Sequence, residues 1–268
     1  MGYENVNLPT PEIFEGTKPN SSALIISSGH STKDILNLKE QIRKKFDVII
    51  ACNRAFENFD DIIDFHLVTE KTTNKGGNIV NQILMNGNFS TAIPRIINWK
   101  GIDLYPNRYN LIKATRSNFG FNPNIRKYKY NNTEGMLIGP LGKQNFSLGS
   151  VTLSAMHFTT MLGSSKIFLI GADMCFKDQF DHFYKDRVYR DTPITTKQAN
   201  SHKIVNVKVG ENNYTTTEFF EESAKYINKM AETIFKDIEI TDFSDGLISS
   251  VKKIKINDYL NVGKLAKI

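Results

Sequence analysis

Two short apolar runs, joined by a polar turn and a charged helical segment, constrain the fold of this chain more than any other feature. The first run, "ALIIS", covers residues 23–27, and the second, "DVIIAC", covers residues 47–52. Apolar residues between them recur at the spacing of one helix face: Ile35, Leu38, Ile42 and Phe46. Runs this apolar are typical of strands buried on both faces of a parallel sheet, which need a crossover between them. The segment therefore predicts a strand, a helix and a second, parallel strand.

The same alternation continues along the chain. Further strands are predicted at residues 64–68, 91–97, 166–170 and 238–241, and further helices at residues 77–85, 151–162 and 215–235. Gly163 follows the second of these helices as a C-cap. Strands that alternate with helices indicate an α/β fold with a Rossmann-like, mostly parallel sheet flanked by helices. Under this prediction, residues 23–27, 48–52 and 167–170 share one sheet.

Length and composition suit one large domain. The 268 residues, of which 40% are hydrophobic and 23% charged, are enough for a sizeable core. We expect an irregular arm over residues 1–20, a single domain over residues 21–250 and a basic tail over residues 251–268. The polar and aromatic segment 178–210 predicts an irregular lid over the carboxyl ends of the strands. Residues 103–145, rich in Asn, Tyr and Gly, predict a second surface excursion.

Charge and cysteine content disfavour several protein classes. No eighteen apolar residues run together and the start has no signal pattern, so we expect a cytoplasmic protein without a transmembrane segment. Cys52 and Cys175 lack the spacing of a zinc site or disulfide framework. The net charge is +6, but the lysines are scattered without a basic-aromatic repeat, so we expect no nucleic-acid partner. Peripheral membrane contact and homo-oligomer formation stay open.

Polar residues follow the predicted strands where those strands end. These clusters are residues 27–32, 52–54, 69–70 and 171–173. Ligands of open parallel sheets bind outside the carboxyl ends of the strands, so we expect the clusters to surround a ligand. Small residues at Ser28, Gly29 and Ser31 would let a phosphate or sugar approach the main chain. A plain structural role is the alternative: Ser31 or Thr32 as a helix cap, for example.

The remaining clusters allow the same two interpretations, ligand binding or a structural role. Asn53 either surrounds the ligand with the other clusters or forms an Asx-turn, and Asp173 either does the same or caps a helix or pairs with a nearby lysine. The stretch "SLGS", residues 147–150, opens a helix and can present unpaired backbone N–H groups to an anion. Two of the five histidines lie in apolar segments and are predicted to be core residues: His66 and His157. The other three lie in polar loops, where a chemical role is more credible: His30, His182 and His202.

Four blocks of the chain, taken in order, resemble one bacterial superfamily. The blocks are "ALIISSGHSTKDI", "VIIACNRAF", "SLGSVTLSAMHFTTMLGSSKIFLIGADMCF" and "GENNYTTTEFFEESAKYI…IEITDFSDGLI". That superfamily includes the Campylobacter-type sialyltransferases, the flagellin-modifying motility accessory factors and the MptE-like 6-hydroxymethylpterin diphosphokinases. The matches span roughly residues 22–250. Ser27 and His30 stand where the superfamily carries a glycine and a proline.

The resemblance implies roles for individual residues. Nucleotide binding would fall to Ser28, Gly29, His30, Ser31, Asn53, Ser147, Leu148, Gly149 and Ser150. Asp173 would border the reacting centre. The sialyltransferases use a histidine general base in a loop before the last long helix, where this chain has Glu211 and Asn212. The candidates here are His202, several residues upstream, and His182, in the loop after the Asp173 block. The loop that holds His182 also offers groups to stabilise a departing phosphate: Tyr184, Lys185, Arg187 and Tyr189.

The resemblance implies a nucleotide-dependent transferase, most simply a sialyltransferase-like glycosyltransferase. Its donor would be a nucleotide sugar such as a CMP-nonulosonate, and its acceptor a bacterial surface glycan or glycoprotein, with no cofactor or metal required. The alternative is an MptE-like diphosphokinase that uses ATP and Mg²⁺, for which Glu70 and Asp173 are available acids. A further alternative is a non-catalytic nucleotide-binding protein with the same pocket.

Overall fold

Eight parallel strands form one sheet in the order β12-β11-β8-β1-β2-β3-β4-β5. The computed structural model describes residues 8–68, 79–98, 105–106, 108–114, 129–130, 133–134, 150–177, 204–233 and 235–261. The strands are β1 (Ser22–Ile26), β2 (Val48–Cys52), β3 (Phe65–Val68), β4 (Arg95–Asn98), β5 (Leu111–Ala114), β8 (Lys166–Ile170), β11 (Glu239–Asp242) and β12 (Lys252–Lys253). The predicted Rossmann-like α/β fold is confirmed, and residues 23–27, 48–52 and 167–170 lie on adjacent strands.

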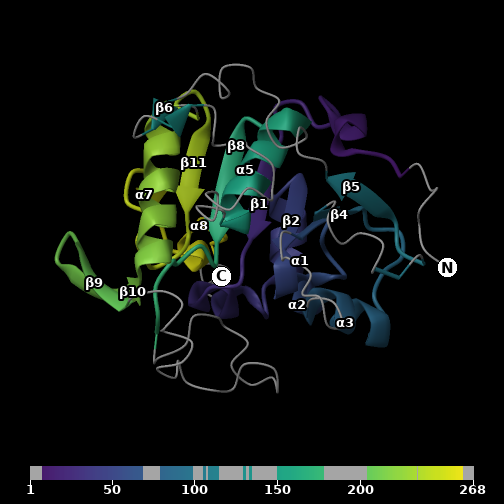
Figure 1. The fold of residues 1–268 in the computed structure, drawn as a ribbon, viewed down its shortest axis with the longest axis horizontal. Coiled ribbons are helices and arrows are strands. Elements are labelled where there is room, and N and C mark those ends of the chain that lie inside the picture. The colour runs from purple at the N-terminus through teal and green to yellow at the C-terminus, as the bar shows by residue number, and fades with distance from the viewer. Residues whose placement is uncertain are drawn as a thin grey trace, which may run out of the picture.

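Helices cover both faces of this sheet (Figure 1). Alternate residues of each strand point to opposite faces, so Ala23 and Ile25 pack on one side and Leu24 and Ile26 on the other. The first side holds α5 (Val151–Leu162) and α7 (Glu218–Thr233). The second holds α1 (Lys39–Lys45), α2 (Phe56–Phe59), α3 (Ile79–Asn86) and α8 (Ile256–Tyr259). Burial on both faces is why these strands read as continuous apolar runs.

The prediction of one helix after β1 is wrong for the first half of that segment. The 3₁₀-helix η2 (His30–Ile35) comes first, and α1 begins only at Lys39. Ser31 and Thr32 do not cap a helix, because their hydroxyls donate to Asp173 Oδ2 and Ser27 O. The expected C-cap of α5 is confirmed: Gly163 has φ +94° and closes the helix.

Two segments predicted to be irregular contain strands. β5 lies within residues 103–145 and forms one edge of the sheet. β9 (Ile204–Val209) lies within the predicted lid and pairs antiparallel with β10 (Asn212–Thr217), so α7 starts later than predicted. The hairpin projects at the end of α7 (Figure 1). The rest of the predicted lid, residues 178–203, lies outside the described residues.

Both chain ends pack on the domain where they are described. η1 (Pro11–Phe14) places the Phe14 ring 5.1 Å from that of Phe65. At the other end, β12 pairs with β11, and the ring of Tyr259 stacks 5.9 Å from that of Phe46. Residues 252–261 of the predicted basic tail therefore pack on the edge of the sheet. Two short strands, β6 (Lys129–Tyr130) and β7 (Thr133–Glu134), form a separate pair. No helix within the described ranges is long and apolar enough to span a bilayer.

Candidate functional site

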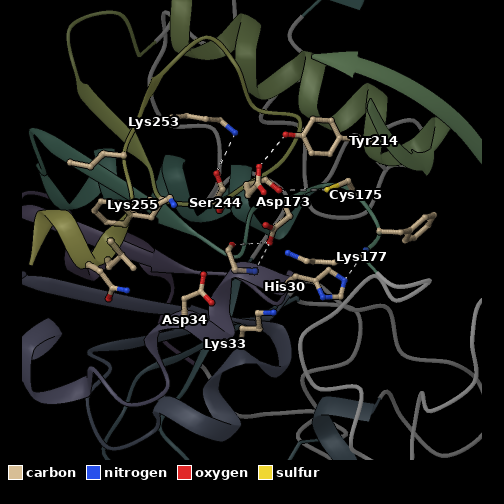
Figure 2. A pocket seen from close by; sticks show the side chains of 17 residues that line it. His30, Lys33, Asp34, Asp173, Cys175, Lys177, Tyr214, Ser244, Lys253 and Lys255 are labelled. Atoms are coloured by element: carbon tan, nitrogen blue, oxygen red, sulfur yellow. Dashed lines mark hydrogen bonds between the residues drawn. The ribbon is translucent and has the colours of Figure 1, made fainter. Parts of the chain in front are cut away.

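A cavity of about 830 Å³ opens where the chain order of the sheet reverses. β1 lies between β8 and β2, so the chain progresses to one edge through β2–β5 and to the other through β8, β11 and β12. In open parallel sheets this switch point forms a crevice at the carboxyl ends of the strands. Residues that follow β1, β8 and β11 line the cavity here, together with residues from β10 and the segment 253–257 (Figure 2).

The floor of the cavity is formed by a network of hydrogen bonds between the loops after β1 and β8. Asp173 Oδ2 accepts from the Ser31 backbone N–H at 3.1 Å and from Ser31 Oγ at 2.9 Å. Ser31 Oγ accepts in turn from the Gly171 N–H at 3.0 Å, and the Gly29 N–H donates to Gly171 O at 2.8 Å. A Cβ on Gly29 would overlap Asp173 Oδ2 and lie 2.6 Å from Gly171 O. The small residues of this turn therefore admit a neighbouring loop of the same chain.

The Asp173 carboxyl is 2% exposed and already holds two donors on one oxygen. Burial raises its pKa above the ordinary value, against the hydrogen bonds from Ser31, which lower it. The main chain of Gly246 lies so close that a Cβ there would overlap Asp173 O. Asp173 thus joins three strand-end loops and forms part of the cavity floor.

Basic groups line the wall beside η2. The Lys177 N–H donates to His30 Nε2 at 3.2 Å, so this nitrogen is unprotonated in that contact. Lys33 follows His30 by three residues, which places both on one face of a 3₁₀-helix. The ammonium groups of Lys33, Lys177 and Lys255 make no hydrogen bond or ion pair within the described part of the chain. Three cations therefore reach this cavity without a direct partner among the described residues.

Lys253 has a different environment and ties the C-terminal segment to the loop after β11. Its ammonium donates to Gly246 O at 2.9 Å and to Ser244 O at 3.3 Å, and lies 3.5 Å from Asp242 Oδ2. Asp242 is buried, and burial raises its pKa to about 7 despite Lys253 and Ser244, while the charge of Asp173 adds to the rise. Lys253 is thus committed to holding the cavity wall together.

The opposite wall carries an acid and a phenol. Tyr214 Oη donates to Asp245 Oδ1 at 3.1 Å, which joins β10 to the loop after β11. Cys175 Sγ lies 3.8 Å from Asp245 O. Burial raises the pKa of the Cys175 thiol to about 12, so this group is a neutral thiol at physiological pH.

Three of the predicted site residues line this cavity: His30, Ser31 and Asp173. Asn53 lies at the end of β2, on the other side of β1, with φ +45° and its carbonyl 2.7 Å from His66 Nε2. Ser150 caps α5, since its hydroxyl accepts from the Thr152 N–H at 3.2 Å.

The remaining candidates divide into three groups. Ser28 and Gly29 belong to the cavity-floor turn but do not line the cavity. His66 and His157 are core residues, as predicted, and burial lowers the pKa of both. Outside the described residues lie Glu70, Ser147, Leu148, Gly149, His182, Tyr184, Lys185, Arg187, Tyr189 and His202.

Magnesium, which the diphosphokinase alternative implies, finds no ligand set among the described residues. No group of three or more His, Cys, Asp or Glu side chains lies there in a metal-binding arrangement. Asp173 Oδ2 is held by Ser31, and Asp245 Oδ1 by Tyr214. We therefore derive no step through a metal.

Sequence reasoning missed most of the cavity wall. The sequence did not indicate four residues of the wall: Lys33, Tyr214, Asp245 and Lys255. Asp245 follows a predicted strand, and this position was a usable signal.

No protein-family model matches the chain, and no curated protein is significantly similar to it.

Proposed function

We propose that the protein is a nucleotide-dependent transferase, of the glycosyltransferase type, whose nucleotide-sugar donor binds in the switch-point cavity. The observation that carries the proposal is this cavity at the carboxyl ends of β1, β8 and β11, with lysines on its wall that have no direct partner among the described residues. The four sequence blocks place the same loops at the nucleotide in the superfamily that the chain resembles. A donor such as a CMP-nonulosonate and a surface glycan acceptor follow from that resemblance.

Glycosyl transfer from a nucleotide sugar requires two kinds of group from the protein. The bond between the sugar and the phosphate oxygen breaks with its electron pair on the phosphate, so fixed cations must meet this charge. Lys33, Lys177 and Lys255 are suited to that role without a metal. The acceptor hydroxyl must also lose its proton to a base as the new bond to the sugar carbon forms. His182 and His202 remain the proposed bases.

Ligand binding provides the first test. Thermal-shift and calorimetric titrations with CMP, CDP, UDP and ATP, each with and without Mg²⁺, should give a cytidine-nucleotide hit that needs no metal. Lys255→Glu should abolish that hit. Lys229→Glu is the matched control, since Lys229 is exposed on α7 and outside the cavity. Binding of ATP only with Mg²⁺ would instead favour the diphosphokinase.

Turnover separates an enzyme from a binding protein. The expected result with the nucleotide sugar that binds is release of its nucleotide, followed by chromatography, in the presence of glycan acceptors or water. A tightly bound donor that is never cleaved would point to a non-catalytic protein. Silence of every nucleotide in the binding panel would contradict all three readings.

A further inference from the structure

Two groups of polar side chains in the cavity differ in their chemical type. His30, Lys33 and Lys177 belong together, because the first two share a face of η2 and the Lys177 N–H bonds to the His30 ring. Tyr214 and Asp245 form a second group through their 3.1 Å hydrogen bond. In Figure 2, Asp173 lies between Lys33 and Tyr214, so the two groups stand on different sides of the cavity floor.

The first group presents free positive charge. The side chains of Lys33 and Lys177 are exposed, and neither ammonium has a hydrogen-bond or ion-pair partner among the described residues. Asp34 also lines the cavity and follows Lys33 directly, so its carboxylate offsets part of this positive charge. No ion pair joins Asp34 to Lys33 within the described structure. Two ammonium groups against one carboxylate leave this side a net positive charge, which attracts a compact anion.

The second group presents acceptors. Asp245 is exposed and gives one carboxylate oxygen to Tyr214, while its other oxygen accepts no hydrogen bond from any described residue. A carboxylate accepts hydrogen bonds and donates none, so it binds hydroxyl groups and repels phosphate. Tyr214 commits its proton to Asp245 and retains acceptor capacity.

The geometry points to a ligand that carries phosphate at one end and hydroxyl groups at the other, held in one orientation. Its phosphate lies against Lys33 and Lys177, and its hydroxyls lie against Asp245 and Tyr214. The inference rests on the proposed function only in placing the substrate in this cavity. A nucleotide sugar has this chemistry, and so has a free sugar phosphate.

The test measures binding of three probes by calorimetry and ³¹P NMR: inorganic phosphate, ribose 5-phosphate and CMP. Lys33→Gln combined with Lys177→Gln should weaken all three by roughly tenfold or more, because charge-assisted bonds to phosphate are lost. Asp245→Asn should weaken ribose 5-phosphate and CMP but leave inorganic phosphate unchanged or tighter, because only the hydroxyl-bearing probes reach that side. Lys229→Gln, outside the cavity, should change nothing.

The outcomes separate this inference from the proposed function. Ribose 5-phosphate binding with this variant pattern, without any nucleotide binding, would keep the orientation and remove the nucleotide transferase. CMP binding that ignores the double lysine change would keep the function and overturn the orientation. Equal losses for inorganic phosphate and ribose 5-phosphate in Asp245→Asn would also overturn it, as would failure of all three probes to bind. Circular dichroism confirms that each variant is folded, which the exposure of all four side chains favours.

Discussion

Replacing Ser31 by alanine tests how much the hydrogen-bond network between the loops after β1 and β8 stabilises the protein. The change removes the 2.9 Å hydrogen bond to the Asp173 carboxylate, and such bonds to charged groups contribute about 1.5–3 kcal/mol. It also leaves the Gly171 N–H without its 3.0 Å acceptor, at a cost of about 1–3 kcal/mol for a buried donor. The Ser31 backbone bond to Asp173 remains. We therefore expect a loss of about 3 kcal/mol in the free energy of unfolding.

The pH adds a second expectation. The Ser31 bonds oppose the rise that burial imposes on the pKa of Asp173, so the variant should have a higher pKa still. Protonation of the carboxyl then relieves part of the loss. The variant should be destabilised more at pH 8 than at pH 5, which urea unfolding followed by circular dichroism at both pH values measures.

Ser28→Ala is the matched control, three residues away in the same turn. The Ser28 hydroxyl is buried and has no hydrogen-bond partner among the described residues. Its removal should change the free energy of unfolding by less than about 0.5 kcal/mol, or stabilise the protein slightly. Equal effects of the two substitutions, or a Ser31→Ala loss below about 0.5 kcal/mol, would refute a stabilising role for this hydrogen-bond network.

Three further substitutions or modifications have defined outcomes. The pKa of Asp242 is raised from 3.8 to about 7, so the stability that this group contributes is present at low pH and falls as the pH rises to about 7. In urea titrations, Asp242→Asn should reduce the dependence of the free energy of unfolding on pH in that range by up to about 1.4 kcal/mol per pH unit. Gly171→Ala, with φ +73° and a Cβ 2.5 Å from Ser27 O, should cost about 3 kcal/mol, whereas Gly210→Ala, with φ +60° and no atom near its Cβ, should cost only about 1 kcal/mol in thermal unfolding. Iodoacetamide should label Cys175 slowly at pH 8 and quickly in urea, as mass spectrometry can follow, because burial raises the thiol pKa to about 12.

The fold could be predicted where strands are buried on both faces. The residues of β2 are all fully buried, and such strands leave an unbroken apolar run in the sequence. β5, "LIKA", lies at the edge of the sheet and carries Lys113, so its run is short and interrupted. β9, "IVNVKV", does alternate between valines and polar residues, but its neighbours in sequence are polar and hid the pattern.

The site could be predicted only where its residues follow strands in the central part of the sheet. The rule on strand carboxyl ends located His30, Ser31 and Asp173. It gave no access to Tyr214, which reaches the cavity from a hairpin outside the main sheet. The sequence also shows that Gly29 must be small without showing what approaches it, which here is Asp173.

The cavity residues divide into those that stabilise the fold and those that do not. Ser31, Asp173 and Lys253 are joined to neighbouring loops by buried or half-buried hydrogen bonds, and Lys253 also lies 3.5 Å from the buried Asp242. Lys33 and Lys177, by contrast, are exposed and unpaired within the described structure, and such side chains contribute little to folding. Two like charges that face the same cavity are mildly unfavourable in the absence of an anion. Folding stability therefore gives no reason for these lysines to face one cavity, whereas binding of a phosphate does.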